Sequence, residues 1–496
     1  MPAYESSLSA NSFAGFYQGG DGYNVSLKYA TEGKNFDVRG GALCPMTAGL
    51  VQPGVISGTS IVTLAALTKR YYTNTTPATA CGKTYLIAVT ANKKLYYQEL
   101  GANSWTEITQ PTGHTITDPQ MDFVTYEVNE RGGTATSAPV DILLMTNATD
   151  GMYCIYADDF SAGWIKIQPV DAEEVRFGII SRHAERIWGS GIKMDPDKLM
   201  YSAPFDPFDW EQNSETPEDG AGDIMQPSWD GDRFTALRNY GSYLLALKKD
   251  TVWRVIGTNP GEYQFKQQFG GGTLVENTVA VYGDIVMMLG YDGLMRYDGA
   301  AVQPFRQPYI QDIMKRLNKS KIDQAVGAVC GTVYYLAMPL DSATENNAIL
   351  EYDFANQTFA IREGVTAKSF MVWEGQLYYT NGSGSVYILG HGEGTGAALP
   401  LRWVSGWQDM GARNVTKSTF RVYLRAERGM TIKVSIQTEK KTKSKVVMLR
   451  AGGKPKRVAL NVSGRFFRII LETDASQNKW WCLDGGLQAV YELDYD

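Results

Sequence analysis

The chain is poor in the residues that build most metal and thiol sites. It has three histidines, His114, His183 and His391, and none of them has a partner at a metal-ligand spacing such as HxxxH. No CxxC pair occurs, and the cysteines are odd in number and widely spaced, which predicts free, mostly buried thiols in a reducing cytoplasm. The five cysteines are Cys44, Cys81, Cys154, Cys330 and Cys482.

Long apolar runs are also missing. No uninterrupted apolar stretch is long enough to span a bilayer, so we expect no membrane insertion. Residues 1–20 have neither a basic n-region nor an apolar h-region, so we expect no secretory signal and assembly inside a cell.

The loops that mark common catalytic sites are absent. Neither Gly270–Gly272 nor Gly392–Gly396 is followed by Lys-Ser/Thr at the start of a helix, and no Gly-X-Ser-X-Gly elbow occurs. Carboxylates are plentiful in one region, but a glycosidase needs two of them facing across a groove, and acidic loop residues are usually solvated. No Ca²⁺-binding DxDxDG occurs. We therefore expect no catalytic, cofactor-binding or metal-binding residue and no enzyme activity. The carboxylates considered are Asp206, Asp209, Glu211, Glu218, Asp219, Asp223, Asp230 and Asp232.

What the chain does have is a loose repeat of strand, tight turn and strand. The clearest copies are Tyr243–Val255, Ile285–Tyr297 and Gln376–Leu389. Asp292-Gly293 and Asn381-Gly382 supply the positive φ values that a tight hairpin turn needs. Hairpins that recur every ~40–50 residues are the signature of a β-propeller.

About seven blades are predicted, with six to eight as the range. Two candidate blades share a Tyr-Asp pair, Tyr297-Asp298 and Tyr352-Asp353, followed by a short turn and then a Phe. We expect each of these turns to join two outer strands. The candidate blades are Thr84–Trp105, Ile142–Ile167, Arg186–Trp210, Phe234–Phe265, Val279–Phe305, Val326–Ile361 and Ser369–Leu389.

Two segments break the hairpin pattern. Pro308–Lys319 carries apolar residues at helical spacing and predicts a helix packed on the blades. Asn213–Pro227 is acidic and turn-rich, and predicts a long surface loop.

The fold class is therefore all-β, in three parts. Residues 1–56 read as an extended N-terminal arm, held by packing on something larger, such as a neighbouring subunit. Residues 57–400 form the β-propeller. Residues 401–496 alternate apolar and polar side chains over short strands and predict a β-sandwich or jelly-roll.

Charge is divided unevenly along the chain. The net charge is −6, yet residues 401–496 hold 18 Lys and Arg against 9 Asp and Glu, so the first 400 residues carry a net −15. Such asymmetry indicates either contact between subunits or two surfaces with different partners. A basic run in residues 401–496 could contact either nucleic acid or an acidic neighbouring protein surface. It lacks the aromatic residues that stack on bases. The run comprises Lys440, Lys441, Lys443, Lys445, Arg450, Lys454, Lys456 and Arg457.

Several segments resemble the bacteriophage tail tubular protein B, or tail nozzle, type of virion protein. They are the opening Phe16–Gly20, the central Ala184–Gly191 with Lys198–Ser202 and Phe205–Trp210, and the closing Arg465–Ile469. The central match is an Arg-Ile-Trp strand, a Tyr-Ser strand and an Asp-Pro turn flanked by aromatics.

The resemblance implies a structural component of the virion tail, a homo-oligomeric and commonly hexameric ring through which the genome is ejected. Its implied partners are copies of itself, other tail or connector proteins and, transiently, the passing DNA. The chain is shorter than many nozzle proteins, so a tail-tip or capsid-attached position stays open. No catalytic residue and no cofactor carry over.

Two other functions stay open. A glycan-binding adhesion propeller on the host surface would use aromatics such as Trp105, Trp164 and Trp210 to stack on sugar rings. A polysaccharide hydrolase would use the carboxylates named above. Saturable sugar binding by a monomer favours the first, and turnover lost with a single Asp or Glu favours the second.

Overall fold

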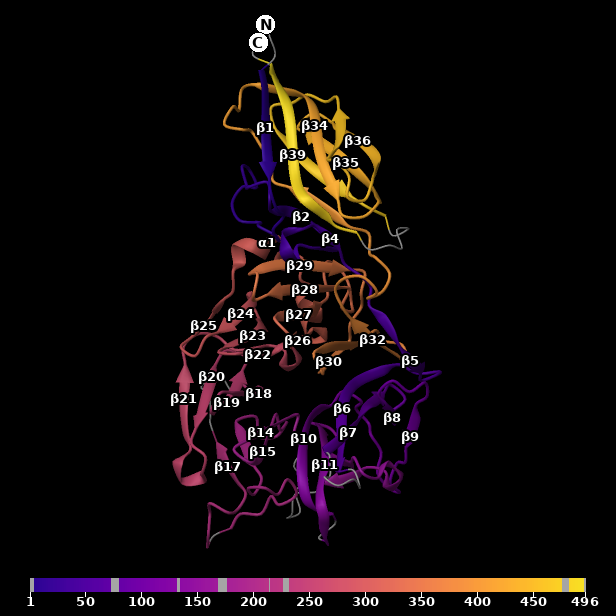
Figure 1. Ribbon diagram of the computed structural model, residues 1–496. Coiled ribbons are helices and arrows are strands. Elements are labelled where there is room, and N and C mark those ends of the chain that lie inside the picture. The colour runs from indigo at the N-terminus through magenta and orange to yellow at the C-terminus, as the bar shows by residue number, and fades with distance from the viewer. Residues whose placement is uncertain are drawn as a thin grey trace.

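The computed structural model describes residues 4–72, 80–131, 134–167, 176–213, 215–225, 232–474 and 481–494. The described chain is all-β, as predicted, with a propeller at one end and a smaller two-sheet unit at the other (Figure 1). None of its helices is long and apolar enough to cross a membrane.

Seven four-stranded antiparallel sheets, the blades, make up the propeller in the described part of the chain. Blade one contains β6 (Ile61–Tyr72), β7 (Ala80–Thr90), β8 (Leu95–Glu99) and β9 (Thr106–Ile108). Blade two contains β10 (Asp122–Arg131), β11 (Thr134–Asn147), β12 (Gly151–Tyr156) and β13 (Ile165–Ile167). Blade three contains β14 (Ile179–His183), β15 (Arg186–Ser190), β16 (Lys198–Tyr201) and β17 (Gly222–Met225).

Blades four to seven contain β18 (Phe234–Tyr240), β19 (Tyr243–Lys248), β20 (Val252–Ile256), β21 (Gln264–Gln268); β22 (Ala280–Tyr282), β23 (Ile285–Gly290), β24 (Gly293–Tyr297), β25 (Val302–Pro304); β26 (Val326–Cys330), β27 (Val333–Met338), β28 (Ala348–Asp353), β29 (Thr358–Glu363); and β30 (Ser369–Trp373), β31 (Gln376–Thr380), β32 (Ser385–Leu389), β5 (Leu50–Val55).

The middle strands of the blades are the most apolar because each blade is covered by a neighbour on both faces. Every residue of β12, β15, β27 and β28 is buried. Apolar clusters lie between consecutive blades, such as the one that joins Leu67 and Ile87 of blade one to Leu143 and Ile155 of blade two. The predicted hairpins are the second and third strands of their blades, and the Tyr-Asp turns do join third strands to fourth strands.

Blade seven is closed by a strand from the other end of the chain. β5 pairs antiparallel with β32, with Val55 opposite Ser385 and Val51 opposite Tyr387. The backbone N–H of Ile56 also donates to the carbonyl of Gly384 over 2.9 Å. The blade predicted as Ser369–Leu389 therefore lacks only the strand that the N-terminal segment supplies.

The second unit is a sandwich of two sheets, and the N-terminal segment contributes a strand to each. One sheet has the order β1 (Tyr4–Ala10), β39 (Leu483–Asp494), β34 (Thr416–Ala426), β37 (Lys456–Leu460). The other has the order β2 (Ala30–Lys34), β33 (Arg402–Ser405), β38 (Phe467–Glu472), β35 (Met430–Thr438), β36 (Thr442–Leu449).

The segment expected to be held by a neighbouring subunit is thus paired within its own chain. β1 pairs with β39, β2 with β33 and β5 with β32. A two-stranded sheet of β3 (Phe36–Asp37) and β4 (Cys44–Pro45) lies between these strands along the chain.

The expectation that all five cysteines are free is wrong for two of them. Cys44 and Cys482 form a disulfide, because Leu43 and Leu483 pair across an antiparallel bridge and bring the two thiols together. The 438 residues between them hide this pairing from any argument based on spacing. Cys154 is buried and Cys330 partly buried, both as free thiols; the side chain of Cys81 lies outside the described residues.

The predicted helix is present as α1 (Gln307–Lys315), with Ile310 and Ile313 buried. It ends before Lys319, where a 3₁₀ turn begins. The predicted loop Asn213–Pro227 is wrong at residues 222–225, since these form β17, a strand too short to show alternation; its residues 214, 226 and 227 lie outside the described part. The 3₁₀ turns are η1 (Arg39–Gly41), η2 (Phe160–Ala162), η3 (Pro260–Glu262), η4 (Glu276–Thr278) and η5 (Lys319–Gln324).

Candidate functional site

The central pocket of the propeller is the first place to look for a ligand site, because clefts at the axis of such folds are common binding sites. The pocket has a volume of about 340 Å³. Its lining comes from all seven blades, at or next to the first strand of each. Lining residues include Thr63, Asp122, Ser181, Arg238, Asn277, Val326 and Ser369.

Three charged side chains meet at this pocket. The Arg238 guanidinium forms an ion pair with Glu276, at 3.3 Å between Nη1 and Oε1, and it also donates to the carbonyls of Leu237, Glu276 and Val279. The Asp122 carboxylate accepts the backbone N–H of Ile180 over 2.8 Å. These contacts join blades two, three and four to the segment that enters blade five.

The two carboxyls of this group lie close enough for the Asp122 charge to disfavour a charge on Glu276. Burial raises the pKa of Asp122, and burial together with the Asp122 charge raises the pKa of Glu276 well above its ordinary value, against the effect of Arg238. The arrangement fits a brace between blades better than an acid–base pair.

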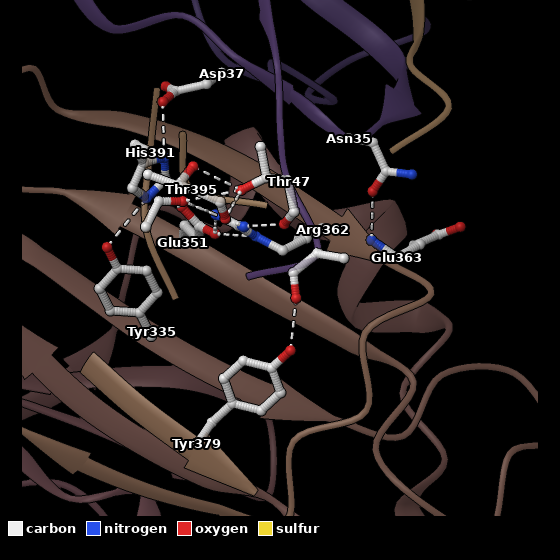
Figure 2. A network of polar contacts seen from close by, with 12 residues as sticks. Asn35, Asp37, Thr47, Tyr335, Glu351, Arg362, Glu363, Tyr379, His391 and Thr395 are labelled. Carbon is white, nitrogen blue, oxygen red and sulfur yellow. Dashed lines mark hydrogen bonds and ion pairs between the residues drawn. The ribbon is translucent and has the colours of Figure 1, made fainter. Parts of the chain in front are cut away.

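A second polar group is buried where the propeller meets the sandwich (Figure 2). Arg362 of β29 and Glu351 of β28 lie side by side in blade six, with 2.8 Å between Nη2 and Oε1. Their side chains are 0% and 3% exposed, so both charges depend on each other for compensation. Arg362 also donates to the carbonyl of Thr47 in the N-terminal segment.

His391 extends this network to a second carboxylate. Its Nδ1 lies 2.9 Å from Asp37 Oδ2, and its Nε2 lies 3.0 Å from Glu351 Oε2 and 3.1 Å from the Tyr335 hydroxyl. Burial disfavours the imidazolium, but the Glu351 charge and the hydrogen bonds to Asp37 and Glu351 outweigh it and raise the pKa of His391. The folded network therefore favours the protonated ring.

Neutral groups complete the contact between the N-terminal segment and the blades, as Figure 2 shows. Asn35 accepts the backbone N–H of Glu363 over 2.7 Å. The Tyr379 hydroxyl donates to the carbonyl of Ala48 over 2.6 Å, and the Thr47 hydroxyl donates to the carbonyl of Thr395 over 3.0 Å. The network acts as a clasp that holds residues 35–48 on blades six and seven.

The other two histidines stand apart from these groups. His183 ends β14, its Nδ1 is 2.9 Å from Asn239 Oδ1, and burial lowers the pKa of its imidazole. His114 packs near Trp164. No group of three or more His, Cys, Asp or Glu in the described part of the chain is placed to hold a metal ion.

Four of the acidic residues considered for catalysis form local hydrogen bonds. Asp206 and Asp209 each accept a backbone N–H two residues further on, Asp223 accepts from Gln212, and Asp232 accepts the backbone N–H of Lys249. Asp230 lies outside the described residues. None of these interactions places two carboxyls across a groove.

The glycine runs connect units. Gly270–Gly272 follows blade four, and Gly392–Gly396 links the propeller to the sandwich.

Two of the three tryptophans considered for sugar stacking are unavailable. Trp164 and Trp210 are 2% and 5% exposed and pack inside the propeller. Trp105 is partly buried against the cluster between blades one and seven. Packing between sheets, the commoner role of blade tryptophans, therefore holds at Trp164 and Trp210, and neither can stack on a sugar ring.

No protein-family model and no curated protein matches the chain. Among solved structures, it is similar to the computationally designed Ika8 protein, with 10% identity, TM-score 0.38, and 69% of this chain and 99% of that one covered. It is similar to BamB from Moraxella catarrhalis, with 8% identity, TM-score 0.37 and coverages of 78% and 98%. It is also similar to YCF48 bound to D1 peptide, with 11% identity, TM-score 0.39 and coverages of 69% and 96%. At this level the likeness concerns the β-propeller fold alone.

Proposed function

We propose that this chain is a non-enzymatic structural protein of a bacteriophage virion, most simply a tail nozzle, tail tube or connector-associated subunit. Copies of it would form a ring through which the genome leaves. The proposal starts from the sequence resemblance, whose central segment is Ala184–Gly191 with Lys198–Ser202 and Phe205–Trp210.

The observation that carries the proposal is the structural use of that central segment. Arg186 is 1% exposed and donates to the carbonyls of Ser202 and Gly220 over 2.8 and 2.6 Å. Its guanidinium lies over the ring of Tyr201, and Trp188 packs against the same ring. The charged residue of this motif donates its hydrogen bonds to backbone carbonyls and so stabilises the blade. This use suits a scaffold rather than a catalyst.

The pairing of the N-terminal segment with strands late in the chain also suits a subunit that must withstand the passage of the genome. The N-terminal segment pairs with β39, β33 and β32, and the Cys44–Cys482 bond ties the same segment to the last strand. Force applied to either end would have to break sheet pairings before either unit opens.

The passage for DNA would be formed between copies. A pocket of about 340 Å³ has the size of a small-molecule site, so the axis of one propeller does not admit a duplex. The net charge of −15 over the first 400 residues would keep DNA from adhering to a lumen built from propellers.

The test is the mass of the purified full chain in solution, with negative-stain images of the same sample. Closed rings with an axial channel support the proposal. A monomer that binds glycans saturably would replace it with adhesion, and polysaccharide turnover lost on one Asp or Glu substitution would replace it with hydrolysis.

A further inference from the structure

The sandwich carries a concentrated cationic surface, flanked in sequence by Glu439, whose carboxylate charge interacts with Lys440. Residues 440–457, here named the basic edge, contain eight Lys and Arg and no Asp or Glu. All eight side chains are exposed, and none forms an ion pair with a described residue. Other cations of the sandwich differ, since Arg402, Lys433 and Arg468 each pair with a carboxylate.

The basic edge also exposes apolar side chains and an unpaired strand. β36 is the last strand of its sheet and is hydrogen-bonded only to β35 among the described strands. Val446 and Met448 on this strand are 64% and 71% exposed. An exposed edge strand with apolar side chains is a template for pairing, and flanking lysines restrict which partner can approach.

Blade three carries the opposite surface. The connection between β16 and β17, residues 202–213 and 215–221, is here named the acidic loop; it contains six Asp and Glu and no Lys or Arg. None of the six forms an ion pair with a described residue. Phe205 in this loop is 71% exposed.

The two surfaces cannot meet within one chain. β36 lies in the sandwich at one end of the molecule, whereas β17, which follows the acidic loop, lies toward the far end of the propeller (Figure 1). Any contact between them therefore joins two copies.

We propose that the basic edge of one copy docks on the acidic loop of the next copy, in a head-to-tail contact. This inference rests on the proposed function, because it names the contact by which subunits of the ring associate. The contact is heterologous, so successive copies close into a ring when the rotation between them allows and extend into a fibre otherwise. Lysines on the basic edge would pair with Glu215 and Glu218, and Val446 and Met448 would be covered along with Phe205.

A protein surface fits the basic edge better than nucleic acid does. Residues 440–457 contain no aromatic residue to stack on a base. Exposed apolar residues in the middle of the strand would gain nothing from phosphates, whereas they are typical of the centre of a protein interface.

The experiment reverses charge on each surface of the full chain. We expect Lys443→Glu with Lys445→Glu, and separately Glu215→Lys with Glu218→Lys, to weaken self-association at least tenfold by mass photometry. An equimolar mixture of the two variants should assemble again, because the substituted glutamates of one variant then face the substituted lysines of the other. Lys266→Glu with Lys321→Glu, a matched reversal at exposed propeller lysines, should leave assembly unchanged.

The outcomes separate the interface from the function. Rings that persist in all variants overturn the head-to-tail contact and leave the ring function standing. Charge-sensitive open chains without closed rings support the contact and overturn the ring. A wild-type monomer overturns both.

A binding measurement with a duplex oligonucleotide tests the nucleic-acid alternative. If the wild type binds the duplex and Lys443→Glu with Lys445→Glu does not, while assembly is unchanged, the basic edge is assigned to nucleic acid instead. Circular dichroism melting of each variant shows whether its fold is retained.

Discussion

The Nε2 atom of His391 lies 3.0 Å from the Oε2 atom of Glu351, inside the clasp between the N-terminal segment and blade six. The imidazole comes from the connection after blade seven, and the carboxylate comes from β28. Glu351 has Arg362 on its other side, so the histidine is the outer of two cations that share one buried carboxylate.

Replacing this histidine should make stability less dependent on pH. The pKa of His391 is higher in the folded chain than its ordinary value of 6.5, so its stabilisation is fully present below about pH 6.5 and is lost as the pH rises through the folded pKa. We expect His391→Gln to cost on the order of 3 kcal/mol at pH 6, since it removes one partner of a buried ion pair, and less at pH 9. Urea unfolding at the two pH values measures the difference.

His183→Gln is the matched control for that measurement. Burial lowers the pKa of His183, so its loss should not produce a penalty that is larger at pH 6 than at pH 9. An equal penalty for His391→Gln at both pH values would mean that folding does not raise the pKa of this ring.

The carboxyl pair of the central pocket should give a pH dependence of the same sign as His391, but its substitution should stabilise the chain rather than destabilise it. A raised pKa means that the folded chain holds a proton which the unfolded Glu276 releases above its ordinary value of 4.5, so stability falls as the pH rises. Glutamine keeps a donor for Asp122 and an acceptor for Arg238. We expect Glu276→Gln to stabilise the chain at pH 8 by on the order of 1 kcal/mol, with the gain vanishing below about pH 4.

The measurement is a set of urea unfolding curves at pH 4, 6 and 8. Glu211→Gln makes the same chemical change at an exposed position and should shift stability little at any of the three. A destabilised Glu276→Gln at pH 8 would contradict a raised pKa of Glu276 and favour an ionised Glu276 paired with Arg238.

The sequence predicted what is local and missed what is distant. Six candidate blades overlap complete four-stranded sheets because Asp292-Gly293 and its equivalents punctuate hairpins that lie next to each other along the chain. The strand that completes the seventh blade, β5, comes from 330 residues away (Val55 to Ser385), where no turn signal can connect the two. Cys44 and Cys482 are missed for the same reason.

The two buried polar groups could not be predicted from the sequence for a related physical reason. Neither Asp122 nor Glu276 belongs to a motif, and only the closure of the propeller brings their carboxyls together. Because histidine is scarce in this sequence, His391 stands out. Its partners do not, since Asp37 lies on β3 and Glu351 on β28. A signal was available in Glu351 and Arg362, since each is a charged residue that directly follows three apolar residues of its strand.

Breaking the Cys44–Cys482 disulfide should destabilise the junction of the two units. It joins residues 438 apart, and loss of a disulfide typically costs about 2–5 kcal/mol. We expect Cys44→Ser with Cys482→Ser to lower the melting temperature, and alkylation of the denatured wild type to label two more thiols after reduction than before. Cys330→Ser, which removes a free thiol, should change neither the melting temperature nor that difference. Equal labelling before and after reduction would contradict the bond.

The closure of blade seven can be tested at a single glycine. A Cβ atom on Gly384 would stand 1.9 Å from the carbonyl oxygen of Ile56, just after β5, so even alanine must push this backbone away. We expect Gly384→Ala to raise hydrogen exchange in residues 50–55 and in β32 while the sandwich strands keep their protection. Gly261→Ala, where a Cβ meets nothing within 4 Å, is the matched control. If Gly384→Ala left residues 50–55 as protected as in the wild type, β5 would not depend on this close approach, and the ring of blades would be closed by its side-chain contacts instead.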